Sequence, residues 1–235
     1  LIKRIASKNQ VIIHSQGSVL TSIGFFALFK NIKIIHTVQN QAEYEAGKKR
    51  MKIHSFYFKY TNVLAVANSK EISNSFLNYY GYRPHAIIYN GLDLDNNTKK
   101  EIDIDKLSNT KDSIKILTVG TLGESKNQKM LIDAFLKLDY RGTSLLIIGA
   151  NPNNYIEEEY IDSLKSKNIF YFGQVQDSVS YMEVCNIFCM SSRNEGLPLV
   201  LMEAKLKNMT VITTRVGGSE EIIDSHDYSV PPNDL

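Results

Sequence analysis

The sequence is poor in the features that mark metal, secreted and membrane-spanning proteins. It has two cysteines in 235 residues, Cys185 and Cys189, without the nearby His and Cys that a zinc site requires. We therefore predict two buried thiols in a reducing compartment, with no metal ion and no cofactor. No apolar run approaches the roughly 20 residues that span a bilayer, and no signal peptide is visible after Leu1.

Acidic residues are scarce in the first part of the chain. The first 92 residues contain 3 Asp and Glu against 12 Lys and Arg, whereas the rest contain 22 against 15. The two parts therefore carry net charges of +9 and −7, which predicts two domains with different partners. No known nucleic-acid-binding motif is visible, so nucleic acid is not an expected partner.

Short apolar runs alternate with helical patterns along the whole chain, which predicts α/β domains with parallel sheets covered on both faces. The expected strands are 11–14, 33–38, 63–67, 85–88, 114–119, 144–149, 169–172, 187–190 and 210–213. The expected helices are 21–29, 43–60, 130–135, 155–165, 179–184 and 199–206, with a short helix opened by Gly217–Gly218. A further helix, capped by Asn68 or Ser69, is expected to run through Tyr80. Residues 93–112 are charged and have few large apolar side chains, so we expect a linker between a domain at 1–92 and one at 113–235.

The segment Ser191–Ala204 is the most informative stretch, because it joins the expected strand 187–190 to the expected helix 199–206. Gly196 lies in the turn, and Pro198 is expected at the first helical position. The first N–H groups of a helix have no internal partner and carry partial positive charge. Because Gly196 has no Cβ, a phosphate could approach the backbone there.

Two glutamates, Glu195 and Glu203, bracket this helix start. At 1.5 Å per residue they lie on the order of 10 Å apart along the axis, which would suit the two ends of a nucleotide sugar. Two solvated surface charges are the simpler interpretation. The apolar neighbours Val200, Met202 and Ala204 argue against it, because an unpaired charge among them is costly.

The stretch from Glu195 to Ala204 resembles the E-x7-E motif of the retaining family-four glycosyltransferases, which have the GT-B fold. The resemblance covers about residues 63–232 well and the first sixty loosely. Further matching segments are Val119–Gly120, Asn90–Asp93, Val211–Thr214 and Gly217–Ile222. It implies two Rossmann-like domains with parallel sheets facing a cleft. Family members begin earlier and continue past Pro232, so the resemblance also implies a chain truncated at both ends, with an incomplete N-terminal domain.

The resemblance implies a metal-independent reaction with front-face attack and retention. Glu195 would hold hydroxyls of the transferred sugar, Glu203 would hold the ribose hydroxyls, and Lys126 would balance the charge of the leaving diphosphate. The expected substrate contacts around the helix start are Gly196, Leu197, Pro198 and Leu199.

Other expected contacts lie in loops at the carboxyl ends of strands. Lys126 matches a family lysine, although a lone loop lysine is usually solvated, and Asn127 lies beside it. Thr121 replaces a family arginine, so one expected phosphate cation is missing. Val175 is the expected contact to the base, with an ordinary turn as the alternative. Gln39 replaces a family histidine and can hydrogen-bond a sugar hydroxyl but cannot take up a proton.

The expected partners are a UDP or GDP sugar as donor and a glycan or lipid-linked acceptor. The basic and aromatic segment 48–60 is either a solvated helix face or an in-plane contact with anionic lipid. We expect a cytoplasmic protein, with a peripheral position on the inner face of the cell membrane if the lipid interpretation holds. A non-catalytic nucleotide-sugar or polyanion binding module is the alternative; the motif spacing gives no support to a GT-B hydrolase or epimerase. His36 and His14 are expected to be buried strand residues.

Overall fold

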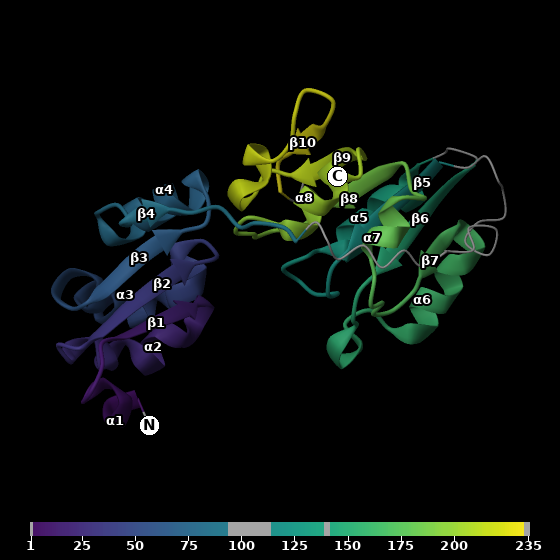
Figure 1. Cartoon of the computed structure of the whole chain (residues 1–235). Helices are drawn as coiled ribbons and strands as arrows, with labels where there is room; N and C mark the ends of the chain where they lie inside the picture. Colours follow the sequence, from purple (N-terminus) through teal and green to yellow (C-terminus); the bar gives the residue numbers. More distant parts are fainter. Residues whose placement is uncertain (1, 94–113, 139–141, 233–235) are drawn as a thin grey trace. The chain divides into compact units, whose positions relative to one another are not determined.

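The computed structural model describes residues 2–93, 114–138 and 142–232 (Figure 1). The chain divides into two compact units. Unit 1 comprises Leu1–Gly91 with Glu195–Leu197, and unit 2 comprises Leu92–Asn194 with Pro198–Leu235. The predicted linker, apart from Asp93, lies outside the described residues, so the predicted domain boundaries stay a prediction. Each unit is described by itself below.

Unit 1 contains a four-stranded parallel sheet in the order β1-β2-β3-β4. Its strands are β1 (Val11–Gln16), β2 (Ile32–Val38), β3 (Val63–Ala67) and β4 (Ala86–Ile87). Its helices are α1 (Ile2–Ala6), η1 (Gly17–Val19), α2 (Leu20–Ile23), η2 (Gly24–Leu28), α3 (Ala42–Tyr60) and α4 (Lys70–Tyr80). The predicted parallel α/β architecture is confirmed for this unit.

Two helices of unit 1 differ from the prediction, and glycine is involved in both. The expected helix 21–29 is a short α2 followed by the 3-10 helix η2. At Gly24 an added Cβ would lie 2.3 Å from the Tyr57 ring, so this ring requires a residue without a side chain. The expected continuous helix 43–60 is kinked at Gly47, whose φ of 66° is a left-handed conformation that favours glycine.

Helix α4 begins and ends as its sequence predicts. Ser69 is the N-cap, and its hydroxyl accepts a hydrogen bond of 3.0 Å from the Ile72 N–H. Gly81 ends the helix with a φ of 80°, and its N–H donates to the Leu77 carbonyl. The capped helix buries Phe76 and Tyr80 in the aromatic core of the unit, against Phe58 and next to Tyr82.

Unit 2 contains a six-stranded parallel sheet in the order β10-β9-β8-β5-β6-β7. Its strands are β5 (Ile114–Val119), β6 (Thr143–Ile148), β7 (Ile169–Tyr171), β8 (Ile187–Met190), β9 (Thr210–Thr214) and β10 (Tyr228–Val230). Its helices are α5 (Gln128–Lys137), η4 (Pro152–Asn154), α6 (Glu158–Leu164), η5 (Lys165–Lys167), α7 (Val179–Met182), α8 (Leu199–Leu206) and η6 (Gly217–Glu221). The bounds predicted for β5, β8 and α8 are confirmed.

Strand β6 shows why a continuous apolar run forms a strand here. All six of its residues are buried, because helices cover both faces of the sheet. Leu145 and Ile147 belong to one hydrophobic cluster, and Leu146 and Ile148 belong to the other. Full burial of each such side chain stabilises the fold by about 1.5–3 kcal/mol.

The prediction was wrong about the start of α6, which begins at Glu158 and not at Tyr155. The 3-10 helix η4 precedes it, and Asn153 and Asn154 take φ values of 55° and 52°, which a continuing α-helix excludes. The prediction also missed α1 and β10, which have five and three residues.

Both cysteines are free thiols, and burial raises the pKa of each to about 12. Among the described residues, no three His, Cys, Asp or Glu side chains lie together as metal ligands would. In the described part of the chain, no helix combines the length and the apolar character that crossing a membrane requires.

Candidate functional site

The central strands of unit 2 define a topological switch point. From β5 the chain proceeds to β6 and β7 on one side, and then to β8 and β9 on the other side of β5. The loop after β5 therefore leads to one side of the sheet and the loop after β8 leads to the other, and both begin at its carboxyl edge. Ligands of open α/β sheets bind at such points, so the unit 2 part of the candidate site is built from residues 120–127 and 191–194 and from the start of α8.

Hydrogen bonds hold these two loops together within unit 2. The Arg193 N–H donates to the Ser125 carbonyl at 2.7 Å, and the Ser191 hydroxyl donates to the Lys126 carbonyl at 2.9 Å. Arg193 also forms an exposed ion pair of 3.2 Å with Glu124. The structure thus brings the predicted Lys126 loop beside the strand end that leads into the predicted motif.

Gln128, at the start of α5, braces the first of these loops. Its side-chain amide donates to the Gly120 and Thr121 carbonyls at 3.1 and 3.2 Å, and its oxygen accepts from the Gly123 N–H at 3.3 Å. The sequence analysis missed this residue. A glutamine at the junction of a glycine-containing loop and a helix was the available signal, because its amide can both donate to and accept from the loop backbone.

The Lys126 side chain lies beside Gly120, at the start of the same loop. A Cβ added to Gly120 would meet its Cδ and Cε at 3.7 and 3.8 Å, so its aliphatic stem lies beside the end of β5. Thr121 is exposed at this loop. Asn127 is buried, has a φ of 54°, and donates its amide to the Met130 sulfur at 3.3 Å.

Three glycines end three adjacent strands of the sheet: Gly120 after β5, Gly149 after β6 and Gly173 shortly after β7. A Cβ at Gly149 would lie 2.0 Å from the Gly120 carbonyl oxygen, and its φ of 149° is rare for other residues. The Gly149 N–H donates to the Gly173 carbonyl at 2.8 Å. The backbones of these strand ends therefore pack directly on one another at this edge. Val175, the predicted base contact, follows Gly173 and is half-buried against a hydrophobic cluster.

Helix α8 begins at Leu199, and Pro198 is its N-cap with extended ψ of 108°, not its first helical residue as predicted. The N-cap residue Pro198 offers no side-chain hydrogen bond to this helix start. Leu201 and Ala204 are fully buried and fix the helix against the sheet, whereas Leu199 is exposed. The arrangement leaves a helix N-terminus at the carboxyl edge, where the macrodipole favours an anion.

Glu203 lies on α8 and is half-buried, and burial raises the pKa of its carboxyl group. Nearby cations are engaged elsewhere: Lys205 pairs with Asp224 and Asp227 at 2.9 and 2.7 Å, and Lys207 pairs with Glu183. Within the described part of the chain, no hydrogen bond or ion pair engages the Glu203 carboxylate. A desolvated carboxylate without a protein partner is costly, so this group is suited to accept hydrogen bonds from a ligand.

The other predicted residues fall in unit 1. Glu195, Gly196 and Leu197 are assigned to it, and Glu195 is buried. The geometry of the Glu195–Glu203 pair therefore stays a prediction. Gln39 follows β2, and its side-chain amide donates to the Gln16 side-chain oxygen at 3.0 Å.

A buried network positions Gln39. One Glu45 oxygen accepts from the Gln39 N–H at 2.9 Å, and the other is bonded to the His36 Nε2 at 2.9 Å. The His36 Nδ1 is bonded to the buried Ser15 hydroxyl, also at 2.9 Å. The prediction that His36 is buried is confirmed. The prediction for His14 was wrong, because β1 is an edge strand and leaves this side chain exposed beside Thr37.

Comparison with known proteins is consistent with this architecture. Residues 99–235 match the family model described as glycosyl transferases group 1. An uncharacterized glycosyltransferase of Methanocaldococcus jannaschii is 27% identical over 210 residues, covering 80% of this chain and 50% of that protein. The capsular polysaccharide biosynthesis glycosyltransferase CapH of Staphylococcus aureus is 26% identical over 243 residues, covering 94% of this chain and 64% of that protein. The chain thus spans half to two thirds of the length of these relatives.

Solved structures show the same fold. The Anabaena protein HepE in complex with UDP matches with a TM-score of 0.81 at 18% identity, covering 99% of this chain and 67% of that one. Sucrose-phosphate synthase from Thermosynechococcus elongatus matches with a TM-score of 0.76 at 19% identity, covering 99% and 64%. The predicted GT-B fold is confirmed by these neighbours together with the two parallel sheets.

Proposed function

This chain belongs to the group 1 glycosyl transferases, and we propose that it moves a sugar from a nucleotide-diphosphate sugar to a glycan or lipid-linked acceptor with retention. The observation that carries the proposal is the half-buried Glu203 carboxylate, which the described residues leave without a partner on the helix that follows the switch point. Hydroxyl groups of a nucleotide sugar can supply the missing hydrogen bonds.

The donor diphosphate would bind at the carboxyl edge of the unit 2 sheet. The N-terminus of α8, where Pro198 offers no capping side chain, supplies backbone N–H groups, and Lys126 supplies a positive charge. Both favour the charge that grows on a leaving diphosphate, so the proposed reaction needs no metal ion. HepE was solved with UDP and with UDP-glucose, which favours UDP over GDP as the nucleotide.

The remaining roles concern the transferred sugar. Glu195 is proposed to accept hydrogen bonds from its hydroxyls, and Gln39 is proposed to hydrogen-bond one of them. Glu45 and His36 are proposed to act by holding the Gln39 backbone, because they contact that backbone or each other. Retention by front-face attack is proposed from the family.

The acceptor is proposed to be a glycan on a lipid carrier. Two relatives from Staphylococcus aureus are named for capsular polysaccharide biosynthesis, and one from Campylobacter jejuni is named as a transferase acting on a diphospho-undecaprenol-linked sugar. In unit 1, α3 exposes the basic residues Lys48, Lys49, Arg50 and Lys52 together with Met51, Ile53, Phe56 and Tyr60. Such a surface would suit anionic headgroups, so we propose a peripheral position on the inner face of the cell membrane.

The test is donor binding and product formation by the full-length protein. Glu203→Gln should weaken binding of UDP-sugars about tenfold or more, which corresponds to about 1.4 kcal/mol. The matched control is Glu159→Gln, which changes an exposed glutamate of α6 and should leave the affinity unchanged. Unchanged affinity in Glu203→Gln would remove this residue from the site. Donor binding without transfer to any acceptor would support a non-catalytic binding module instead.

A further inference from the structure

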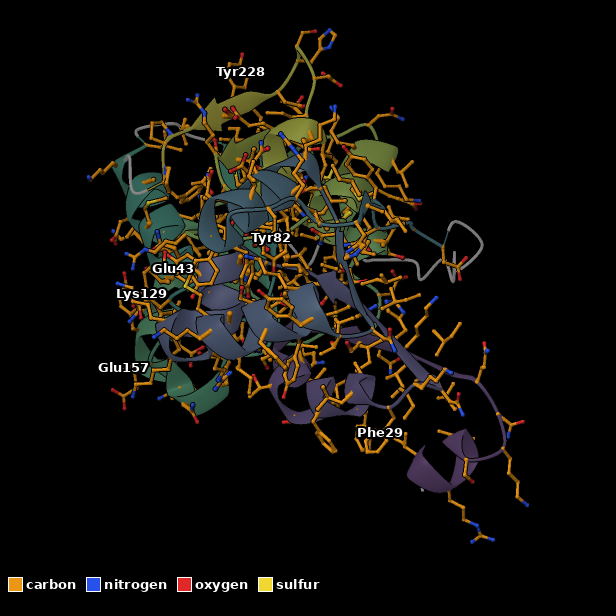
Figure 2. All side chains as sticks on the ribbon, turned by 90° about the vertical axis from the view of Figure 1, so that its left-hand side faces the viewer. Phe29, Glu43, Tyr82, Lys129, Glu157 and Tyr228 are labelled. Atoms are coloured by element: carbon orange, nitrogen blue, oxygen red, sulfur yellow. The ribbon has the colours of Figure 1, made fainter. Side chains whose placement is uncertain are left out.

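A cavity of about 410 Å³ lies on the α5–α6 side of unit 2, and it shares no residue with the proposed donor site. One wall is a single face of α5, because Lys129, Ile132 and Asp133 are three and four positions apart. The opposite wall is the segment 154–157 with Tyr160 of α6. Figure 2 shows Lys129 and Glu157 next to one another at the edge of these helices.

The segment that forms the second wall is held in place by its own hydrogen bonds. The Asn151 side chain donates to the Ile156 carbonyl at 2.7 Å and accepts from the Ile156 N–H at 3.1 Å. Ile156 and Ile132 are buried and anchor the two walls in the same hydrophobic cluster. The cavity is therefore largely pre-formed, which is typical of binding sites for small ligands.

The lining combines aromatic rings with carboxylates. Tyr160 is 41% exposed, and Asp133 and Glu157 are also exposed at the rim. The Lys129 ammonium lies 4.4 Å from the centre of the Tyr155 ring and occupies one of its faces. Tyr160 thus offers the more accessible ring, and the carboxylates beside it can accept hydrogen bonds.

This chemistry fits a sugar ring better than a phosphate. The C–H groups of a pyranose can pack on the negative face of a tyrosine ring, while its hydroxyls donate to carboxylates. Lys129, Asp133 and Glu157 together give the lining a net charge of −1, which opposes an anionic ligand. The open cavity also has room for a sugar unit, since small-molecule sites measure about 300–1,000 Å³.

We infer that this cavity is a second saccharide site, which binds a neutral sugar unit of the glycan that the protein elongates. The inference rests on the proposed function for the identity of the glycan. A second site on the same protein would raise the effective concentration of a growing chain near the donor site. Its affinity would be modest, because one aromatic ring and two exposed carboxylates form the contact.

The experiment measures binding of three neutral probes, maltotetraose, cellotetraose and chitotetraose, to the full-length protein by NMR titration. At least one should bind in the millimolar range and shift signals of the loop 151–157. Tyr160→Ala should weaken that binding fivefold or more, and Asp133→Asn should weaken it two- to fivefold. UDP affinity should be unchanged in both variants, because neither residue belongs to the proposed donor site.

The matched control is Tyr228→Ala, which removes an exposed tyrosine of unit 2 outside the cavity (Figure 2) and should leave saccharide binding unchanged. Binding of none of the three probes, or binding that survives Tyr160→Ala, would overturn the inference. Preferential binding of inorganic pyrophosphate at the same loop would also overturn it. If the unmodified protein does not bind UDP, the proposed function alone is contradicted, because saccharide binding is measured in a separate titration.

Discussion

The two units have parallel sheets of the same kind but are specialised in different ways. The strand order of unit 1 follows the chain from β1 to β4, whereas the order in unit 2 reverses between β5 and β8. The reversal opens the carboxyl edge of unit 2, where glycines bring backbone close to backbone. Unit 1 instead contains buried polar side chains bonded to one another, such as His36 with Glu45 and His54 with Thr21.

This difference separates two ways of building a site. Backbone groups at the edge of unit 2 can contact a phosphate directly, and glycine is what gives access to them. The proposed contact of Gln39 depends instead on a side chain, whose backbone N–H is held by Glu45 and, through Glu45, by His36. The net charge also differs between the two parts of the chain. The first 92 residues carry +9 and would suit an anionic surface, whereas the rest carry −7 and include the carboxylate Glu203.

Among the predicted changes, the largest loss of stability should follow from substitution of Gly149 in unit 2. Gly149→Ala would place a Cβ 2.0 Å from the Gly120 carbonyl oxygen at a φ of 149°. Strain and overlap together should lower the free energy of unfolding by about 4 kcal/mol, measured by urea denaturation. The control is Gly123→Ala, whose Cβ would meet nothing within 4 Å and which should cost less than about 1 kcal/mol. Equal costs in the two variants would show that the edge is not closely packed.

The sequence predicted the features that depend on local patterns and missed those that depend on residues far apart in the chain. The bounds of β5, β8 and α8 follow from short, mostly apolar runs and from local helix signals, and these predicted bounds were confirmed. The 3-10 helix at Gly24 and the Gln128 brace depend on partners that the pattern does not reveal. Tyr57 lies 33 positions from Gly24, and only the packed fold brings them together. His14 was mispredicted because position at a sheet edge is a property of topology and not of local sequence.

The candidate site, like the fold, could be predicted only in part from the sequence. Lys126 and the loop after β8 could be placed at one edge, because the carboxyl ends of parallel strands meet there. The absence of a described partner for Glu203 could not be predicted, since it depends on Lys205 and Lys207 pairing with other carboxylates. The cavity beside α5 depends on the Asn151 hydrogen bonds and had no signal in the sequence analysis.

The second-largest loss of stability should follow from disruption of the buried network of unit 1, which joins Ser15, His36, Glu45 and the Gln39 backbone. Glu45→Ala would leave the His36 imidazole and the Gln39 N–H without their carboxylate partner, and each buried polar group left unsatisfied costs about 1–3 kcal/mol. Hydrogen exchange should show faster opening of β2 and β3, with β5 and β6 unchanged. Glu43→Ala, at an exposed position of the same helix, should change stability by less than about 0.5 kcal/mol. Equal acceleration in both sheets would contradict a network confined to unit 1.

The free energy of unfolding should depend on pH in unit 1, because this unit contains the buried His54. Burial, followed by the nearby His36, lowers the pKa of His54 to about 4, while Glu45 opposes the shift. Because the folded pKa lies below the unfolded value of about 6.5, the stabilisation is present above pH 6.5 and is lost as the pH falls toward 4. The loss should be on the order of 2 kcal/mol in unit 1. His54→Gln, which can still bond Thr21, should remove this dependence; an unaltered acid profile in that variant would assign it to another group.

The smallest effect should come from the exposed basic face of α3. Each lysine near an anionic membrane surface contributes about 1 kcal/mol, so Lys49→Gln should reduce binding to vesicles rich in phosphatidylserine about fivefold. Binding to neutral phosphatidylcholine vesicles should be weak and unaffected by the change. Lys167→Gln removes an exposed lysine from unit 2 and should leave binding unchanged, because the proposal assigns the lipid contact to the α3 surface alone. If the two variants lose binding equally, net charge and not the α3 surface governs the attraction, and the assignment of lipid contact to unit 1 fails.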